Sequence, residues 1–348
     1  MERNRIIELF NQFKNIKVAV IGDFFLDKYL VIDTRLNEPS IETKLTAYQV
    51  VKTREYPGAS GTVTNNLSAL GVGEIYAVGF VGNDGNGYEL KRELDKMGVN
   101  RKYLFETDYM VTPTYTKPMM LENGIETESN RQDIKNFKPT DRQVENRILN
   151  CLDEVFENND AIIILDQMVE NDCGVITGKI RDEIIRQAGK QGNKIIFADS
   201  RARIHLFKDI SIKCNNFEVC RAFNSSLNEE PEYKDVLECG EKLYEQNRRP
   251  AFVTLGRDGM VTFGDMGTIK VPTADVPRPY DICGAGDSVT ASVVSALAAG
   301  ANQAEAAFIG NIVASITIRK IGVTGTASLK EVLETFDDYF YNVEYSQE

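Results

Sequence analysis

Short apolar runs alternate with segments of helical apolar spacing along most of this chain, and this alternation limits what it can fold into. The runs occupy residues 17–23, 75–82, 161–166, 194–199, 210–214 and 251–255. Runs of this length are typical of strands buried on both faces of a parallel sheet. The sequence therefore predicts an α/β fold, with a mostly parallel sheet covered by helices on both sides.

Two other regions, residues 28–56 and 104–133, have a different character. They are polar and rich in β-branched residues, with a loose alternation of apolar and polar positions. This pattern is typical of antiparallel strands that have one face open to solvent. We expect the two regions to pair into one small sheet beside the main body of a single domain, residues 1–348.

Polar residues follow several of the predicted buried strands. Asp23, Asp166 and Asp199 end three of the runs, and Asn215 and Glu218 follow a fourth. Ligands of open α/β sheets bind along the carboxyl edge of the strands. Because polar positions recur at that edge, we expect a binding site along it, although a single aspartate there would equally cap a helix.

The segment from Asp281 to Asp287, which reads DICGAGD, is the most informative motif. Gly284, Ala285 and Gly286 lead into Asp287 and then into a helical apolar pattern. Small residues at the start of a helix leave N–H groups unpaired, and with the helix dipole these groups bind phosphate. An aspartate inside such a site can take a proton from a hydroxyl while the N–H groups hold a phosphoryl group. A capped helix after a glycine turn is the structural alternative.

Composition excludes several classes of function. The chain has 348 residues and a net charge of −12, which argues against nucleic-acid and membrane-surface partners. The single histidine, His205, rules out multi-histidine metal sites and argues against Ser-His-Asp catalysis. Six cysteines without a CxxC pair, and no apolar run of about 18 residues, predict reduced thiols in a cytoplasmic protein without a membrane span.

The common nucleotide-binding signatures are missing from the sequence. It contains neither a Walker A motif nor a G-x-G-x-x-G that opens a helix after a strand, which disfavours P-loop and dinucleotide-binding proteins. Thr254, Gly256 and Gly259 instead follow a predicted strand and enter a hairpin. Their hydroxyl and N–H groups could bind phosphate or ribose, although a plain hairpin has the same composition.

Four segments carry a resemblance to a known family: IGDFFLDKY (21–29), REYPGASGTVTNNLSALG (54–71), RQD (131–133) and DICGAGDSV (281–289). In these segments the chain resembles the PfkB/ribokinase family of carbohydrate kinases. Within that family it looks most like the kinase module that phosphorylates heptose 7-phosphate. The resemblance implies a ribokinase-like three-layer α/β/α sandwich, with residues 28–56 and 104–133 forming a small β lid.

The resemblance also implies a reaction and residue roles. The γ-phosphate of ATP would pass to a hydroxyl of a sugar or sugar phosphate, with Mg²⁺ and, in some family members, K⁺. Asp287 would be the catalytic base, and Gly284, Ala285 and Gly286 would form the anion hole for the γ-phosphate. The nucleotide and its Mg²⁺ would be bound by Asn215, Glu218, Thr254, Gly256, Gly259 and Asn311.

By the same resemblance, the acceptor and a monovalent cation have candidate residues. Asp281 and Cys283 would offer backbone oxygens to the cation. For the aspartates that would face the sugar, the alternative role is a helix cap. Arg131 could bind a substrate phosphate, or it could lie exposed on the lid. The residues that would face the sugar are Asp23, Asp27, Gly58, Ala59, Asn66, Arg131 and Asp166.

The residues leave the acceptor open. Where the family commonly has G-G-A-A-x-N, this chain has GASGT at residues 58–62, and a Cβ at Ala59 limits how closely a sugar approaches the backbone. A heptose 7-phosphate-like acceptor is favoured. The alternatives are fructose phosphate, ribose or a nucleoside as acceptor, a non-catalytic sugar or nucleotide sensor, and a Rossmann oxidoreductase. Apolar surface on a small lid sheet predicts a homodimer formed through the lid.

Overall fold

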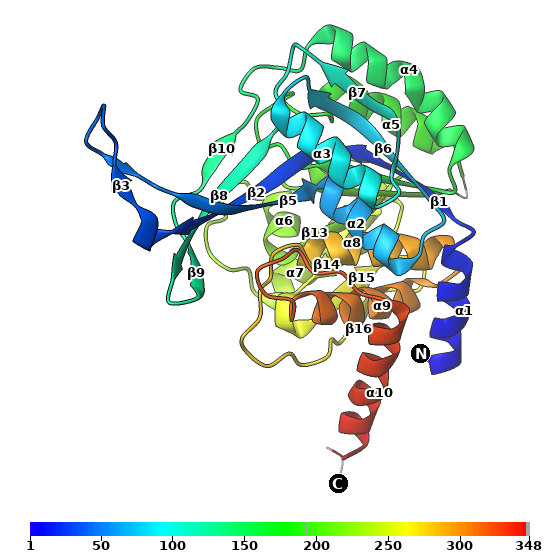
Figure 1. The fold of residues 1–348 in the computed structure, drawn as a ribbon. Coiled ribbons are helices and arrows are strands. Elements are labelled where there is room, and N and C mark those ends of the chain that lie inside the picture. Colours follow the sequence, from blue (N-terminus) through cyan, green and yellow to red (C-terminus); the bar gives the residue numbers. More distant parts are fainter. Residues whose placement is uncertain (193, 346–348) are drawn as a thin grey trace.

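A nine-stranded sheet forms the centre of the molecule (Figure 1). The computed structural model describes the backbone of residues 1–192 and 194–345, with side chains as far as residue 339. The strands are β1 (Lys17–Gly22), β6 (Glu74–Gly82), β7 (Asn100–Thr107), β11 (Ala161–Asp166), β12 (Ile195–Ser200), β13 (Ser211–Asn215), β14 (Ala251–Thr254), β15 (Met260–Phe263) and β16 (Ile269–Val271). Their order across the sheet is β16-β15-β14-β13-β12-β11-β1-β6-β7.

The strands from β14 to β7 run parallel, whereas β15 and β16 are antiparallel to their neighbours. Side chains of β1 alternate between two hydrophobic cores: Val18 and Val20 pack in one, and Ala19 and Ile21 in the other. Both faces of the strand are buried, which explains its uninterrupted apolar sequence. The mostly parallel sheet predicted from the apolar runs is confirmed.

Helices cover each face of this sheet, so the predicted three-layer sandwich is also confirmed (Figure 1). None of the helices in the described residues is long and apolar enough to cross a membrane. One layer contains α1 (Arg3–Phe13), α2 (Ser60–Leu70), α3 (Gly85–Lys96), α8 (Ala285–Ala298), α9 (Gln303–Thr317) and α10 (Leu329–Tyr345). The other contains α4 (Arg142–Asn158), α5 (Gly178–Lys190), α6 (Asn216–Arg221) and α7 (Tyr233–Asn247).

A small five-stranded sheet extends from the edge of the body (Figure 1). Its strands are β2 (Phe24–Asp33), β5 (Val50–Ala59), β8 (Thr114–Glu122), β9 (Ile125–Glu128) and β10 (Gln132–Ile134). They are ordered β10-β8-β2-β5, with β9 paired to β8, and β2 runs parallel to β8. Beyond them, β3 (Glu38–Pro39) and β4 (Thr46–Ala47) pair as a projecting hairpin.

The boundary of the small sheet differs from the expectation for residues 104–133. Residues 104–107 belong to β7, the edge strand of the large sheet, and the contribution to the small sheet begins at Thr114. The reason is burial, because Leu104 packs into the main hydrophobic core.

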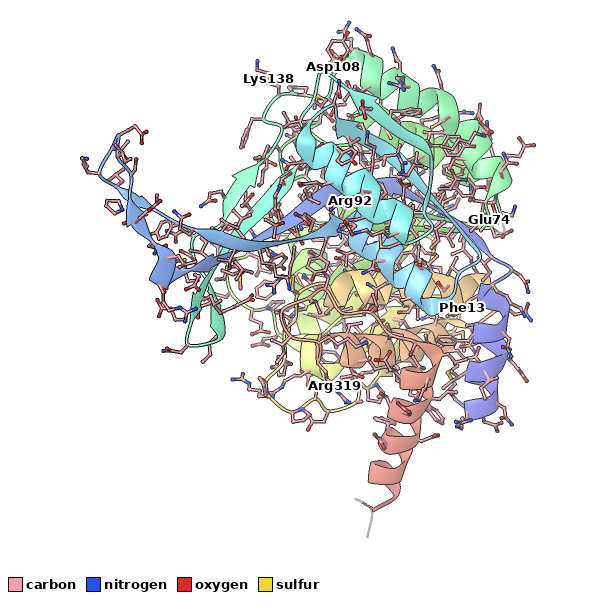
Figure 2. The ribbon with its side chains drawn as sticks, in the orientation of Figure 1. Phe13, Glu74, Arg92, Asp108, Lys138 and Arg319 are labelled. Atoms are coloured by element: carbon pink, nitrogen blue, oxygen red, sulfur yellow. The ribbon has the colours of Figure 1, made fainter. Side chains whose placement is uncertain are left out.

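Two connections fix the small sheet to the body. β2 follows β1 after a single residue, Asp23, and β5 runs directly into α2. Ion pairs to α3 add to this attachment: Lys28 Nζ lies 2.8 Å from Glu89 Oε2, and Arg92 Nη2 lies 3.6 Å from Glu55 Oε2 (Figure 2). The small sheet is therefore held at the carboxyl end of β1, the edge where a ligand is expected.

Candidate active site

Asp287 lies in the first turn of α8, directly behind a glycine turn. Gly284 is the N-cap and has a φ of 77°, a conformation that favours glycine. The Ala285 N–H already donates to the Ile282 carbonyl at 3.1 Å. The N–H groups of residues 286 and 287 fall in the first turn, where a helix offers them no backbone acceptor. The start of α8 therefore brings two N–H groups and a carboxylate to one place.

The surroundings of Asp287 disfavour its ionised form. Burial raises the pKa of its carboxyl to about 7, and the nearby Asp199 carboxylate adds to the rise. The positive charges of Lys213 and Arg201 act in the opposite direction. A general base works best when its pKa is close to the working pH, so Asp287 is suited to accept a proton from a hydroxyl.

A buried lysine lies behind the first turn of α8. Lys213 of β13 donates from Nζ to Asp199 Oδ2 at 2.8 Å, and the Thr290 hydroxyl of α8 donates to the same oxygen at 3.2 Å. A Cβ at position 286 would lie 2.8 Å from Lys213 Nζ, so Gly286 is needed for this close approach. The carboxylate at the end of β12 thus ties β13 to α8 and fixes the position of the turn.

Asn215 and Glu218 form a capping box at the start of α6. The Asn215 side chain accepts from the Glu218 N–H, and Glu218 Oε2 accepts from the Asn215 N–H, both at 2.8 Å. Burial raises the pKa of Glu218. Among the described residues, no three His, Cys, Asp or Glu side chains gather as a metal site. Carboxylate and amide oxygens of this kind suit Mg²⁺ that is held mainly by phosphates and water.

The predicted hairpin after β14 lies beside this capping box. Thr254 is the register partner of Asn215 across the β13–β14 pair, and its hydroxyl donates to the Cys214 carbonyl at 3.4 Å. Gly256 and Gly259 have φ values of 60° and 85°, which a side chain would disfavour. The two segments predicted to bind nucleotide are therefore neighbours at the carboxyl edge.

Asn311 of α9 is buried, and its amide is already occupied. Nδ2 donates to the Val271 and Pro272 carbonyls at 2.9 and 3.0 Å. The side chain therefore holds the chain that leaves β16. Contact with the nucleotide, which the family resemblance implied for Asn311, would have to come from the segment that Asn311 holds.

Asp27 and Gly58 lie together on the small sheet. A Cβ on Gly58 would come within 3.2 Å of Asp27 Oδ2, so glycine leaves this carboxylate open. Lys117 Nζ is 3.8 Å from Asp27 Oδ1. Burial raises the pKa of Asp27, while the positive charge of Lys117 opposes the rise. The negative charge of Asp27 also contributes to the raised pKa of Asp287.

Asp23 has a different role from the one expected. Its Oδ1 accepts the Val175 N–H at 2.6 Å, and its Oδ2 accepts the N–H groups of Gln167 and Met168 at 3.0 and 3.1 Å. The side chain is 3 % exposed. Because three backbone donors already occupy the carboxylate, Asp23 holds the loop after β11, a role different from the sugar contact expected for it.

Asp166 and Asn66 are also committed to the protein. Asp166 Oδ2 accepts from the Ser200 hydroxyl at 2.7 Å, and its Oδ1 lies 3.4 Å from Arg203 Nη2. Burial raises the pKa of Asp166 to about 6. Asn66 is fully buried in α2 and donates to the Thr62 carbonyl at 3.0 Å. Both side chains are buried, and the Asn66 side-chain oxygen has no hydrogen-bond partner among the described residues.

Arg131 and Ala59 flank the Asp27 region. Arg131 forms two hydrogen bonds with Asp133, at 2.7 and 2.9 Å, and its guanidinium stacks 4.3 Å from the centre of the Tyr115 ring. Ala59 has a φ of 51° and a ψ of −116°, a strained combination for a residue with a Cβ. Its side chain packs against a small cluster that contains Phe25 and Met168.

The cation segment has a simple local geometry. Asp281 Oδ1 accepts the Cys283 N–H at 2.9 Å, which closes a tight turn before α8. Cys283 is an exposed free thiol. This turn leaves backbone oxygens near the glycine turn but does not by itself identify a bound ion.

Sequence reasoning missed the basic residues of the site. Lys213 and Lys117 are buried, and Arg201 donates to Gln167 at 2.8 Å beside the carboxyl edge. The signal for Lys213 was a lysine inside the apolar run ISIKC. Lys117 gives no such signal, because its partners Asp27 and Tyr29 are about ninety residues away in the chain.

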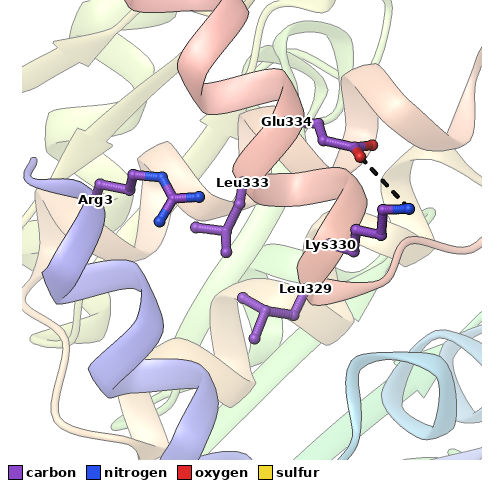
Figure 3. Close-up of a pocket in the computed structure, with 5 residues that line it drawn as sticks. All are labelled: Arg3, Leu329, Lys330, Leu333 and Glu334. Carbon is purple, nitrogen blue, oxygen red and sulfur yellow. Dashed lines mark ion pairs between the residues drawn. The ribbon is translucent and has the colours of Figure 1, made fainter.

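A groove of ≈ 530 Å³ lies elsewhere, between α1 and α10 (Figure 3). It is lined by Arg3, Leu329, Lys330, Leu333 and Glu334, none of which belongs to the site around Asp287.

Comparison with known proteins places this chain in a family. The pfkB family carbohydrate kinase pattern matches residues 16–330. Two curated relatives are the bifunctional protein HldE of Nitratiruptor sp., 28% identical over 320 residues, and that of Geobacter metallireducens, 28% identical over 336 residues. These alignments cover 91% and 96% of this chain but only 64% and 65% of the relatives. The chain thus spans less than two thirds of their length.

Solved structures show the same fold at lower identity. Arabidopsis thaliana ribokinase complexed with ribose and ATP aligns with a TM-score of 0.68 and 18% identity, covering 92% of this chain and 98% of that one. Escherichia coli phosphofructokinase-2 in complex with potassium aligns with a TM-score of 0.70 and 16% identity, covering 93% and 99%. The fold is ribokinase-like. With the family pattern matched over most of its length, the chain belongs to the pfkB family of carbohydrate kinases.

Proposed function

We propose that this protein transfers the γ-phosphate of ATP to a hydroxyl of a sugar phosphate, with a heptose 7-phosphate as the favoured acceptor. The observation that carries the proposal is Asp287 at the start of α8, with its pKa raised to about 7 beside unpaired N–H groups. The similarity to HldE proteins supports the choice of acceptor.

In this proposal Asp287 takes the proton of the attacking hydroxyl. The N–H groups at Gly286 and Asp287 hold the transferring phosphoryl group, and the turn at Gly284 and Ala285 shapes the anion hole. Most of the acceleration comes from positioning and from stabilising negative charge, as is general for phosphoryl transfer. Arg201, near Asp287, adds a positive charge beside the same space.

The nucleotide would lie along the carboxyl edge, over Thr254, Gly256 and Gly259. Asn215 and Glu218 would hold Mg²⁺, largely through water, and the ion would neutralise phosphate charge. Asp281 and Cys283 would offer backbone oxygens to K⁺. Asn311 would act indirectly, through the segment after β16 that it holds.

The acceptor would lie under the small sheet, which would act as a lid. Asp27 and Gly58 would bind its hydroxyls, and Ala59 would limit how deeply it enters. Asp23 and Asp166 would position the surrounding loops, and Asn66 would act from within α2. Arg131 would exchange Asp133 for a substrate phosphate, since the guanidinium binds both groups through the same two donors.

A homodimer through the small sheet is part of the same proposal. Large apolar side chains are exposed on its strands and hairpin, including Ile41 at 84 %, Leu45 at 71 % and Ile125 at 69 %. Exposed apolar surface of this kind marks an interaction site. Light scattering should give a mass near twice 39.0 kDa, and a monomer mass at micromolar concentration would exclude the dimer.

The test of the function is acceptor-dependent formation of ADP by the wild type and Asp287→Asn. A panel of heptose 7-phosphate, fructose 6-phosphate and ribose should yield one acceptor that the wild type phosphorylates. Asp287→Asn should lower kcat for it by about 10² to 10⁴, the range for loss of a general base, while ATP binding by calorimetry persists. Retention of wild-type kcat in this variant would refute the assignment, and binding without turnover in the wild type would indicate a sensor.

A further inference from the structure

Lys117 of β8 is a buried ammonium with few partners. It is 7 % exposed, and its Nζ donates to the Tyr29 hydroxyl at 3.0 Å. An ammonium has three N–H donors. Nζ also lies 4.8 Å from the centre of the Tyr29 ring, and Asp27 Oδ1, at 3.8 Å, is beyond hydrogen-bonding distance. Buried donors without an acceptor are costly, so the unused N–H groups point to a ligand.

Lys117 and Asp27 lie on the same face of the small sheet. The β2–β8 register pairs Asp27 with Tyr115 and Tyr29 with Lys117. Residues two apart on a strand share a face, so all four side chains project to one side. The small sheet lies near the glycine turn before α8, because a Cβ on Gly284 would come within 3.4 Å of the Thr62 side chain, whose hydroxyl donates to the Pro57 carbonyl of β5.

We infer that Lys117 determines acceptor specificity. Together with Asp27 it binds one hydroxyl of the sugar: Lys117 donates a hydrogen bond to the hydroxyl oxygen, and Asp27 accepts a hydrogen bond from the hydroxyl. This inference rests on the proposed kinase function. One oxygen can reach both groups, because two hydrogen bonds of about 2.8 Å span the 3.8 Å between them when they meet at nearly a right angle.

A hydroxyl fits this pair better than a phosphate does. A phosphate bound to Lys117 Nζ would be brought beside the Asp27 carboxylate, because Oδ1 lies only 3.8 Å from Nζ, and the two negative charges would repel. A hydroxyl is neutral and is both donor and acceptor, so it satisfies the ammonium and the carboxylate together. The positive charge of Lys117 opposes the rise in the pKa of buried Asp27. It therefore favours the ionised form of Asp27, which accepts a hydrogen bond from the hydroxyl.

The first experiment compares Lys117→Met with Lys28→Met on the sugar phosphate that the wild type turns over. Lys28 neighbours Asp27 on β2 but pairs with Glu89 of α3, so it controls for the loss of a lysine charge from the same sheet. Lys117→Met should raise the KM for the acceptor about 10- to 100-fold, the range for a hydrogen bond to a charged group, with the KM for ATP unchanged. Lys28→Met should leave both KM values within about twofold.

The second experiment separates binding from a structural role by using monodeoxy analogues of the acceptor. For the analogue that lacks the bound hydroxyl, the kcat/KM of the wild type should fall by about the same 10- to 100-fold factor. The kcat/KM of Lys117→Met should be nearly the same for this analogue as for the full acceptor. If Lys117→Met unfolds early in a thermal melt, Lys117→Gln, which keeps a donor, replaces it. The inference about Lys117, but not the proposed function, would be overturned by an unchanged acceptor KM in Lys117→Met. It would also be overturned if the loss from the variant and the loss from the analogue added up for every analogue. Absence of sugar-dependent ADP formation in the wild type would instead refute the proposed function.

Discussion

The proposed phosphate end and the proposed acceptor end of this site are built in different ways. At the phosphate end, α6 starts directly after the buried strand β13, and the start of α8 presents backbone N–H groups. At the acceptor end, side chains of β2 and β8 meet across a small sheet, with about ninety residues between them in the chain. The phosphate end depends on residues that are close together in the sequence and form short motifs. The acceptor end depends on how distant strands pair. The reaction can therefore be read from the sequence more easily than the substrate can.

Asp23 and Asp27 show this contrast within five residues of the chain. Asp23 has its carboxylate filled by three backbone N–H groups, while Asp27 has an open carboxylate beside Lys117. Asp27→Asn should raise the acceptor KM about 10- to 100-fold, as loss of a charged hydrogen-bond acceptor does, with little change in stability. Steady-state kinetics with varied acceptor measures this. An unchanged KM would remove Asp27 from the acceptor site.

Asp23→Asn should act on the fold instead. An amide cannot accept all three N–H groups, so the free energy of unfolding should fall by about 3 kcal/mol, measured by urea denaturation. The acceptor KM of the protein that remains folded should stay near the wild-type value. A stable variant with a raised KM would show that the two aspartates share one role.

Glu218→Gln separates the two jobs of the capping box. Glutamine at this position still accepts the Asn215 N–H, so the start of α6 should persist. Loss of the negative charge should weaken Mg²⁺ binding, and the Mg²⁺ concentration for half-maximal activity should rise about tenfold. An Mg²⁺ dependence equal to that of the wild type would leave Glu218 with a capping role alone.

The start of α8 follows the sequence pattern closely, because the helix begins directly after the predicted glycine turn. The turn places Asp287 in the first turn of the helix, and the distant Asp199, through Lys213 and Thr290, ties that helix to the sheet. Asp23 and Asp166 were harder, because the same strand-end aspartate can accept backbone N–H groups or face a ligand, and only the fold decides. The position of Lys117 beside Asp27 could not be predicted, because it depends on the register of β2 with β8. The β-like pattern of residues 104–107 gave no indication that they join the large sheet.

The stability of Asp287→Asn should depend on pH. The folded-state pKa of Asp287 is raised to about 7, so its ionisation destabilises the fold fully above pH 7, and the penalty disappears as pH falls toward the unfolded value near 3.8. The variant should therefore melt a few degrees above the wild type at pH 8, with the difference fading near pH 4. Thermal melts across pH measure this. A constant difference would exclude the strained carboxylate.

Ala59→Gly should have the smallest effect. Glycine adopts the φ of 51° without strain, which should raise the free energy of unfolding by about 1 to 3 kcal/mol. The greater conformational freedom of glycine in the unfolded chain offsets up to about 1 kcal/mol of this gain. A net gain of about 1 kcal/mol should appear in urea denaturation. Loss of stability would mean that packing of the Ala59 methyl against Phe25 and Met168 outweighs the strain.

The pH dependence of kcat/KM tests the central claim most directly. If Asp287 is the base, kcat/KM should rise tenfold per pH unit below about pH 7 and level off above it, because only the carboxylate accepts the proton. A profile that is flat from about pH 5.5 to 8.5 would contradict the account.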